Sequence, residues 1–233
     1  MARVYLRTIN QNIYQIGFIV IMVSISNINK LTINPVVQKP HAPGKTKIMA
    51  ALRSLLEEKE FISVTTAEIA KTAGVTEALI YKYFSDKRDL LHQVLAEYLG
   101  VMIVRAEMDV RGIKGALHQL RKLIWSHVNM YADNRVFARI LLIEVRNHPD
   151  YFESDAYKMV KYYTNFLLSL IQKGVDEGSI RNDIPTSIIR QTILGSIEHA
   201  CLPAVIFSHP IQTDEISDQL CEIIFTGIAT RDD

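Results

Sequence analysis

The chain has 233 residues, 48% of them hydrophobic and 22% charged, so it is long and apolar enough to bury a sizeable core. This composition excludes wholesale disorder, collagen and a polytopic membrane protein, and ten glycines with seven prolines argue against an all-β domain full of tight turns. The 26 basic and 25 acidic residues nearly cancel, so any surface that binds nucleic acid must be a local patch.

Residues 1–44 differ from the rest of the chain and are expected to form an N-terminal extension. The stretch 9–29 carries no charge, and Arg3 and Arg7 precede it. Two interpretations stay open: the stretch is a secretory signal or membrane anchor, or it is either an upstream stretch included by a misplaced start codon or a poorly ordered arm. We favour the second, because the next segment belongs in the cytoplasm. Two prolines and a glycine in 39–44 form a linker.

From Lys45 onward the spacing of apolar residues predicts helices to the end of the chain, and therefore an all-α fold. Apolar residues at three- and four-residue intervals predict a first helix over 45–59. Thr65 and Glu68 have the spacing of a capping box, which predicts a short helix from there to about Thr72.

Gly74 interrupts the helical pattern and suits a tight turn between two helices. Thr76 is expected to cap the next helix, over 77–84, and Ser85 or Asp86 a long third one. Two short helices joined by a turn that contains glycine form a helix-turn-helix.

The pattern F-x3-T-x3-I-A-x2-A-G-V-x4-I-Y-x-Y-F-x2-K-x2-L-L over 61–91 closely resembles the DNA-binding domain of TetR-family repressors. The resemblance covers about 45–95 and implies a three-helix DNA-binding domain there, with a helical effector-binding and dimerisation domain over 96–233. Family members often have glycine where this chain has Glu60. A left-handed Glu60 would cost about 1 kcal/mol, unless the first helix ends differently.

The second helix of the pair is expected to lie in the major groove of a palindromic DNA operator. The resemblance implies phosphate contacts from Tyr81, Tyr83 and Lys87, together with Thr65 or Thr66. Bases are expected to be read by Glu77, Ala78 and Lys82, with Ala67 as a further candidate. Thr76 is small enough for close approach, and Lys45 and Lys47 are additional candidates for phosphate contacts. Alternatively, the tyrosines are surface aromatics and Glu77 only stabilises its helix.

Further helices are expected over 114–131, 135–147, 153–176, 186–207 and 215–229. In TetR-family proteins the last two long helices pair with a second subunit, which implies a homodimer. The residues expected at that interface are Ile189, Ile193, Ile197, Leu220, Ile224 and Gly227.

Polar and aromatic residues on apolar helix faces suggest a pocket for a small effector. The candidates are Trp125, Tyr131, Phe137, Leu141, Glu144, His148, Tyr163, Glu198 and His199. For each one, the alternative is an internal ion pair without a ligand, with Arg146, Arg190, His148 or His199 as the partner of a carboxylate. The segments 139–144 and 195–199 loosely resemble family members that sense acyl-CoA or other lipid-like ligands.

The sequence contains no catalytic, metal-binding or cofactor-binding motif that we recognise, so no enzyme, metal or cofactor is expected. Cys201 and Cys221 are too few for a disulfide framework and are expected to be core residues in a reduced, cytoplasmic protein. The leading hypothesis is a ligand-responsive, homodimeric repressor without a membrane partner. The alternatives are a membrane-tethered regulator and a helical enzyme with an incidental helix-turn-helix.

Overall fold

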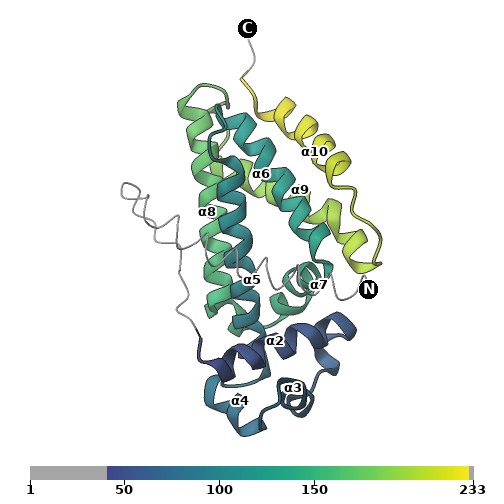
Figure 1. Cartoon of the computed structure of the whole chain (residues 1–233). Helices are drawn as coiled ribbons and strands as arrows, with labels where there is room; N and C mark the ends of the chain where they lie inside the picture. The colour runs from purple at the N-terminus through teal and green to yellow at the C-terminus, as the bar shows by residue number, and fades with distance from the viewer. Residues whose placement is uncertain (1–40, 231–233) are drawn as a thin grey trace. The chain divides into compact units, whose positions relative to one another are not determined.

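The computed structural model describes residues 41–230, and the interpretations of residues 1–40 lie outside them. Figure 1 shows the helices that these residues form. Apart from an isolated bridge between Ile180 and Ala229, this part of the chain contains no β-structure, which confirms the all-α expectation. None of its helices is long and apolar enough to span a bilayer.

Three short helices and the start of a long one form the helix-turn-helix part. They are α2 (Pro43–Glu58), α3 (Thr66–Ala73), α4 (Glu77–Tyr83) and α5 (Lys87–Val110), with a 3-10 turn η1 (Phe61–Ser63) between α2 and α3. Helix α2 packs against α3, α4 and α5. Ile80 and Phe84 are buried in this core, as their four-residue spacing predicts.

Local signals set the helix ends in this part. Thr65 caps α3 with the predicted capping box, and Gly74 ends it with a φ of 66°. Asp86 caps α5 by accepting hydrogen bonds from two backbone amides. Thr76 stands at the N-cap of α4, as predicted, although its hydroxyl makes no capping hydrogen bond.

The first helix ends without a left-handed residue. Lys59 and Glu60 have extended backbones, with φ values of −152° and −69°, so the strain considered for Glu60 does not arise. Glu60 instead accepts a 2.6 Å hydrogen bond from Arg139, far along the chain.

The rest of the described chain is a helical bundle that also includes the second half of α5. Its long helices are α6 (Ala116–Asp133), α8 (Asp155–Asp176), α9 (Thr186–Ile206) and α10 (Thr213–Ile228). Helix α6 is central, because it packs against α5, α8, α9 and α10. Gly174 permits a close contact at one end, where an added Cβ would stand 2.4 Å from the Cδ1 atom of Ile180.

The segment 135–147 departs from the continuous helix that its pattern predicts. It begins as α7 (Arg135–Arg139), widens into a π-helical turn η2 (Ile140–Glu144), and tightens into the 3-10 turn η3 (Val145–Asn147). A further 3-10 turn, η4 (Pro149–Glu153), leads to α8. A π turn is often found at a functional site and changes which residues share a helix face.

Four residues expected at a subunit interface lie in the core of their own chain. Ile189, Ile193 and Ile197 on α9 and Ile224 on α10 are at most 5% exposed. Their apolar spacing marked the side of each helix that faces the bundle, so their placement at an interface was wrong. Leu220 is half-buried and Gly227 is exposed.

Candidate functional site

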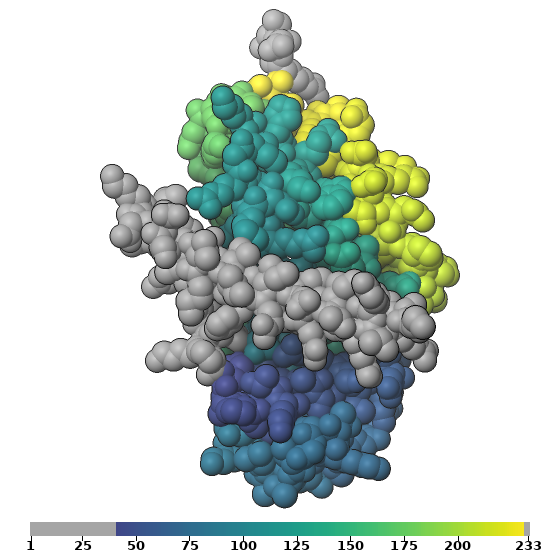
Figure 2. Space-filling model, viewed as in Figure 1, coloured from purple at the N-terminus to yellow at the C-terminus, as the bar shows by residue number. Residues whose placement is uncertain are grey.

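Helix α4 presents a polar surface of four exposed residues on the side away from its core contacts. Glu77, Ala78, Tyr81 and Lys82 are exposed, and the Tyr81 side chain is 55% accessible. Helices α2, α3 and α4 form the purple to blue surface in Figure 2. A short helix with such a face can enter a DNA major groove.

Two of the predicted DNA-contact residues are joined to each other. The Thr66 hydroxyl at the start of α3 donates a 2.9 Å hydrogen bond to the Glu77 carboxylate at the start of α4. This bond links the amino-terminal ends of both helices of the motif. It also gives Glu77 a role within the protein alongside base reading.

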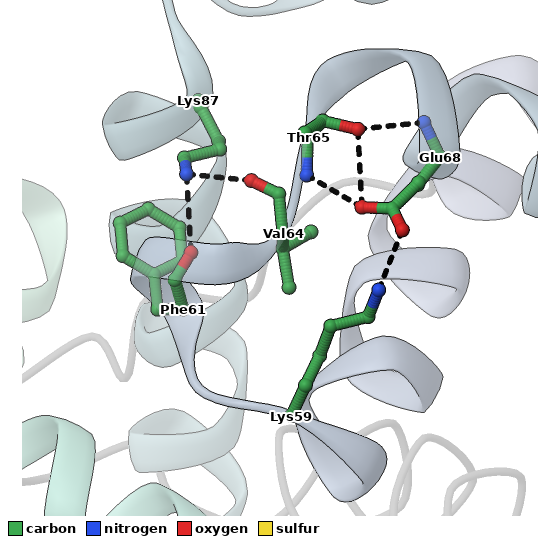
Figure 3. A network of polar contacts seen from close by, with 6 residues as sticks. All are labelled: Lys59, Phe61, Val64, Thr65, Glu68 and Lys87. Atoms are coloured by element: carbon green, nitrogen blue, oxygen red, sulfur yellow. Dashed lines mark hydrogen bonds and ion pairs between the residues drawn. The ribbon is translucent and has the colours of Figure 1, made fainter.

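Lys87 is fixed by the backbone near η1. Its ammonium donates to the carbonyl oxygens of Phe61 and Val64, at 3.1 and 2.6 Å, and lies 4.4 Å from the Phe61 ring centre (Figure 3). Burial lowers the pKa of Lys87. A lysine ammonium has three donors, so one remains for a phosphate.

A second network beside Lys87 fixes the start of α3. Glu68 accepts from the Thr65 amide and hydroxyl and from Lys59, the last at 2.5 Å (Figure 3). The Lys59 ammonium and these hydrogen bonds lower the pKa of Glu68 to about 2. This network holds the amino-terminal end of α3 at the surface, where the first backbone amides of the helix can meet a phosphate.

The remaining predicted DNA contacts are spread over α2 and the ends of α4. Lys47 and Thr76 are exposed. Lys45 lies 5.5 Å from the Phe84 ring centre, and Tyr83 packs beside Gly44. Tyr81 and Tyr83 therefore point to different sides of α4, as their spacing predicts.

A pocket opens inside the bundle between α5, α6, α8 and α9. Its cavity volume is about 80 Å³, several times what one water molecule needs. Its apolar wall includes Leu99, Ile103, Met130, Val160 and Leu194. This wall is suited to the apolar part of a ligand.

Five of the predicted pocket residues line this space, namely Trp125, Tyr131, Leu141, Tyr163 and Glu198. Four others do not. Phe137 stacks on Tyr98 with ring centres 4.3 Å apart, and His199 is exposed on α9. Glu144 ends the π turn and His148 has an extended backbone, so neither continues the helix face that Leu141 begins.

Arg146 is the partner of the Glu198 carboxylate. The two form a bidentate pair with N–O distances of 2.9 and 2.6 Å. The sequence offered four basic candidates for this partner, and the structure selects Arg146. Elsewhere on the lining, Arg105 pairs with Asp133 at 3.3 Å, and Asp109 accepts from Ser126 at 2.6 Å.

His127 is a pocket residue that the sequence reasoning missed. It is buried on α6, and its ring nitrogens meet the hydroxyls of Tyr131 and Tyr163. Its position four residues before Tyr131 places both on one helix face, and this spacing was an available signal. Burial lowers the pKa of His127 to about 4.

Both cysteines are fully buried core residues, as predicted. Burial raises the pKa of the Cys201 and Cys221 thiols to about 11. They are therefore protonated near neutral pH and are poor nucleophiles.

Two family models together match most of the chain. One, described as bacterial regulatory proteins of the tetR family, matches residues 48–94. The other, described as the C-terminal region of YsiA-like proteins, matches residues 95–227.

Similar proteins include named regulators. The "Fatty acid metabolism regulator protein" of Bacillus subtilis is 26% identical over 193 residues, which are 83% of this chain and all of that protein. The structure of the regulator FadR from Bacillus subtilis in complex with stearoyl-CoA has a TM-score of 0.70 and 26% identity, over 78% of this chain and 98% of that one. FadR from Bacillus halodurans, at 22% identity and a TM-score of 0.72, shares the fold over 81% of this chain and 98% of its own.

Proposed function

Since the chain belongs to the tetR family of bacterial regulatory proteins and is a transcriptional regulator, we propose that it is a homodimeric repressor of a palindromic operator. Its effector is a lipid-like molecule with an acyl-CoA as the leading class. It acts as a regulator and not as an enzyme, and it works in the cytoplasm, where its DNA is.

One observation carries this proposal: a single folded unit contains both the exposed face of α4 and an apolar pocket. Helix α5 begins beside α4 and ends beside the pocket, and Leu99, Ile103 and Ala106 of its second half line that pocket. Helix α5 therefore connects the DNA-binding surface to the pocket. This arrangement supports a mechanism in which a ligand shifts the protein between two states with different DNA affinities.

The named relatives support the class of effector. The solved regulator with 26% identity was captured with stearoyl-CoA, and the pocket here has a largely apolar wall. A ligand that lowers DNA affinity must bind the DNA-bound protein more weakly by the same factor.

In the proposed complex, the side chains that contact DNA fall into two groups, those that read bases and those that hold phosphates. Lys82 and Glu77 read bases, with Ala78 and Ala67 beside them. Phosphates are held by Lys45, Lys47, Thr65, Thr66, Tyr81, Tyr83 and Lys87, while Thr76 lets the backbone approach closely.

The test is a binding titration on an operator obtained by footprinting the full chain. Lys82→Ala should cost about 1–3 kcal/mol on the native site and much less on a site altered at one base pair per half-site. Tyr81→Phe should weaken all sites alike by about 1 kcal/mol, with an unchanged salt slope. Stearoyl-CoA should weaken binding to the native site.

Three results would count against the proposal. A footprint without two-fold symmetry contradicts a palindromic operator. A uniform loss for Lys82→Ala, with a salt slope reduced by about one, assigns Lys82 to a phosphate. Unchanged DNA affinity in saturating stearoyl-CoA excludes that ligand as the effector.

A further inference from the structure

A cluster of three hydrogen-bonding side chains stands on the otherwise apolar pocket wall. His127 and Tyr131 come from α6 and Tyr163 from α8, and all three line the pocket. The His127 Nε2 atom is 3.0 Å from the Tyr131 hydroxyl, and its Nδ1 atom is 3.1 Å from the Tyr163 hydroxyl. The histidine therefore bridges the two tyrosines.

The protonation state of this cluster follows from its burial. Burial keeps His127 neutral at physiological pH, with a pKa of about 4, and it raises the pKa of both tyrosines. Each tyrosine thus keeps its hydroxyl hydrogen, and the imidazole carries one N–H. The cluster holds three polar hydrogens in total.

Two hydrogen bonds can use only two of these three hydrogens. If the histidine donates from Nδ1 to Tyr163, Tyr131 donates to Nε2 and the Tyr163 hydrogen is left over. If it donates from Nε2 to Tyr131, the Tyr131 hydrogen is left over instead. Within residues 41–230 the two hydroxyls have no other protein partner, so either tautomer leaves one O–H donor at the pocket wall.

The charges on the pocket lining determine which kind of ligand group can accept a hydrogen bond from this donor. The lining contains two guanidinium groups, on Arg105 and Arg146, and each already faces a carboxylate. It also contains three carboxylates, on Asp109, Asp133 and Glu198. An anionic group would meet a net negative wall, so a neutral acceptor oxygen is the matching partner.

We propose that the Tyr131–His127–Tyr163 cluster binds the neutral carbonyl oxygen of an acyl chain in the pocket. The inference rests on the proposed function, because it assumes that the pocket takes the effector, and it adds the group by which the ligand is recognised. An acyl thioester supplies such a carbonyl, while its charged part stays outside this lining.

The experiment compares two ligands that differ by this oxygen. Stearoyl-CoA carries the thioester carbonyl, and S-octadecyl-CoA is a thioether of the same chain length without it. Calorimetry on the full chain should show that stearoyl-CoA binds about fivefold more tightly, as expected for one neutral hydrogen bond. The double variant Tyr131→Phe/Tyr163→Phe should lose most of this preference, because it keeps both rings and removes both hydroxyls.

Tyr162→Phe is the matched control. Tyr162 is the neighbour of Tyr163 on α8, lies outside the pocket lining, and donates a 2.6 Å hydrogen bond to Glu107. This variant should keep the wild-type preference for stearoyl-CoA.

The outcomes separate the two proposals. If the wild-type chain binds both ligands equally, the carbonyl is not read and this inference fails, while the effector class stands. A double variant that folds and keeps the full preference also overturns the inference. If neither ligand binds, the acyl-CoA effector fails and this inference fails with it. Should the double variant not fold, the wild-type comparison alone still decides.

Discussion

Lys87 links two elements that are far apart in the sequence. Its ammonium reaches the carbonyls of Phe61 and Val64, which precede it by 26 and 23 residues. These carbonyls belong to the first residue of the η1 turn and to the residue directly after it, so the lysine connects the segment before α3 to the start of α5. Lys87, which the family resemblance assigns to the DNA-binding surface, therefore also stabilises the fold.

Replacing Lys87 by Met should destabilise the fold even without DNA. The substitution keeps an apolar stem over the Phe61 ring but removes the ammonium that donates to the Phe61 and Val64 carbonyls, which should cost about 2 kcal/mol. Urea unfolding of the free protein measures this loss. Lys82→Met on exposed α4 is the control and should change stability by less than about 0.5 kcal/mol. Equal midpoints for both variants would mean that the Lys87 contacts contribute no net stability.

Residue-level predictions from sequence were accurate where the cause is local. Ile80 and Phe84 are core residues because they are four apart on a helix, and Cys201 and Cys221 are buried as small apolar residues. The carbonyl partners of Lys87 depend on how η1 meets α5, and no sequence spacing contains that information. The spacing of His127 and Tyr131 shows that they share a helix face, but the contact of His127 with Tyr163 depends on how α6 packs against α8.

At the scale of elements, the sequence pattern predicted α3 correctly but predicted the segment after α6 incorrectly. The capping box and Gly74 predicted both ends of α3, since their hydrogen bonds are made within a few residues. The segment after α6 was predicted as one helix over 135–147. Its π turn shifts the helix face after Ile140, so Leu141 lines the pocket but Glu144 and His148 do not.

The capping box should also give α3 a pH-dependent stability. The pKa of Glu68 lies near 2 in the fold, below its ordinary value of 4.5, because Lys59 and Thr65 stabilise the carboxylate. A depressed pKa adds stability that is complete above about pH 4.5 and is lost as the pH falls toward 2. Glu68→Gln should therefore flatten this part of the stability curve.

Unfolding free energies of the wild type and Glu68→Gln between pH 2 and 7 test this expectation. Glu58→Gln, an exposed position at the end of α2, is the control and should keep the wild-type slope. If both variants have the same slope, the Lys59–Glu68 contact does not couple to folding.

For the molecule as a whole, the two C-terminal helices have an outer face as well as a core face. Ile188 and Ile223 are 49% and 73% exposed, and a Cβ added at Gly195 or Gly227 would meet no atom within 4 Å. Figure 2 shows part of this surface in yellow and yellow-green. Small residues beside exposed isoleucines permit the close approach of a second copy. We therefore propose that the dimer forms through this face.

Ile188→Glu and Ile223→Glu should each weaken the dimer. Burying an isoleucine stabilises an interface by about 1.5–3 kcal/mol, so each change should raise the dimer dissociation constant at least about tenfold. Sedimentation velocity over a concentration series measures it. Met108→Glu on α5, at a side chain 40% exposed, is the control and should leave the dimer intact. Unchanged dimers for both isoleucine variants would move the interface to another surface.

Which side of α9 and α10 is outside could not be read from the apolar spacing alone. Both sides of these helices carry isoleucines, and only their packing against α6, α8 and each other shows which ones are internal. The helices themselves were predicted within two residues of their ends.

The tryptophan of the pocket wall has an optical consequence. The chain contains one tryptophan, Trp125, and its indole N–H donates a 2.7 Å hydrogen bond to Asp214 while Lys122 lies 3.8 Å from the ring centre. Indole emission from this protein therefore originates from a single place, beside two opposite charges. The unmodified chain thus carries its own fluorophore on the pocket lining, and a ligand that changes the surroundings of Trp125 changes its emission.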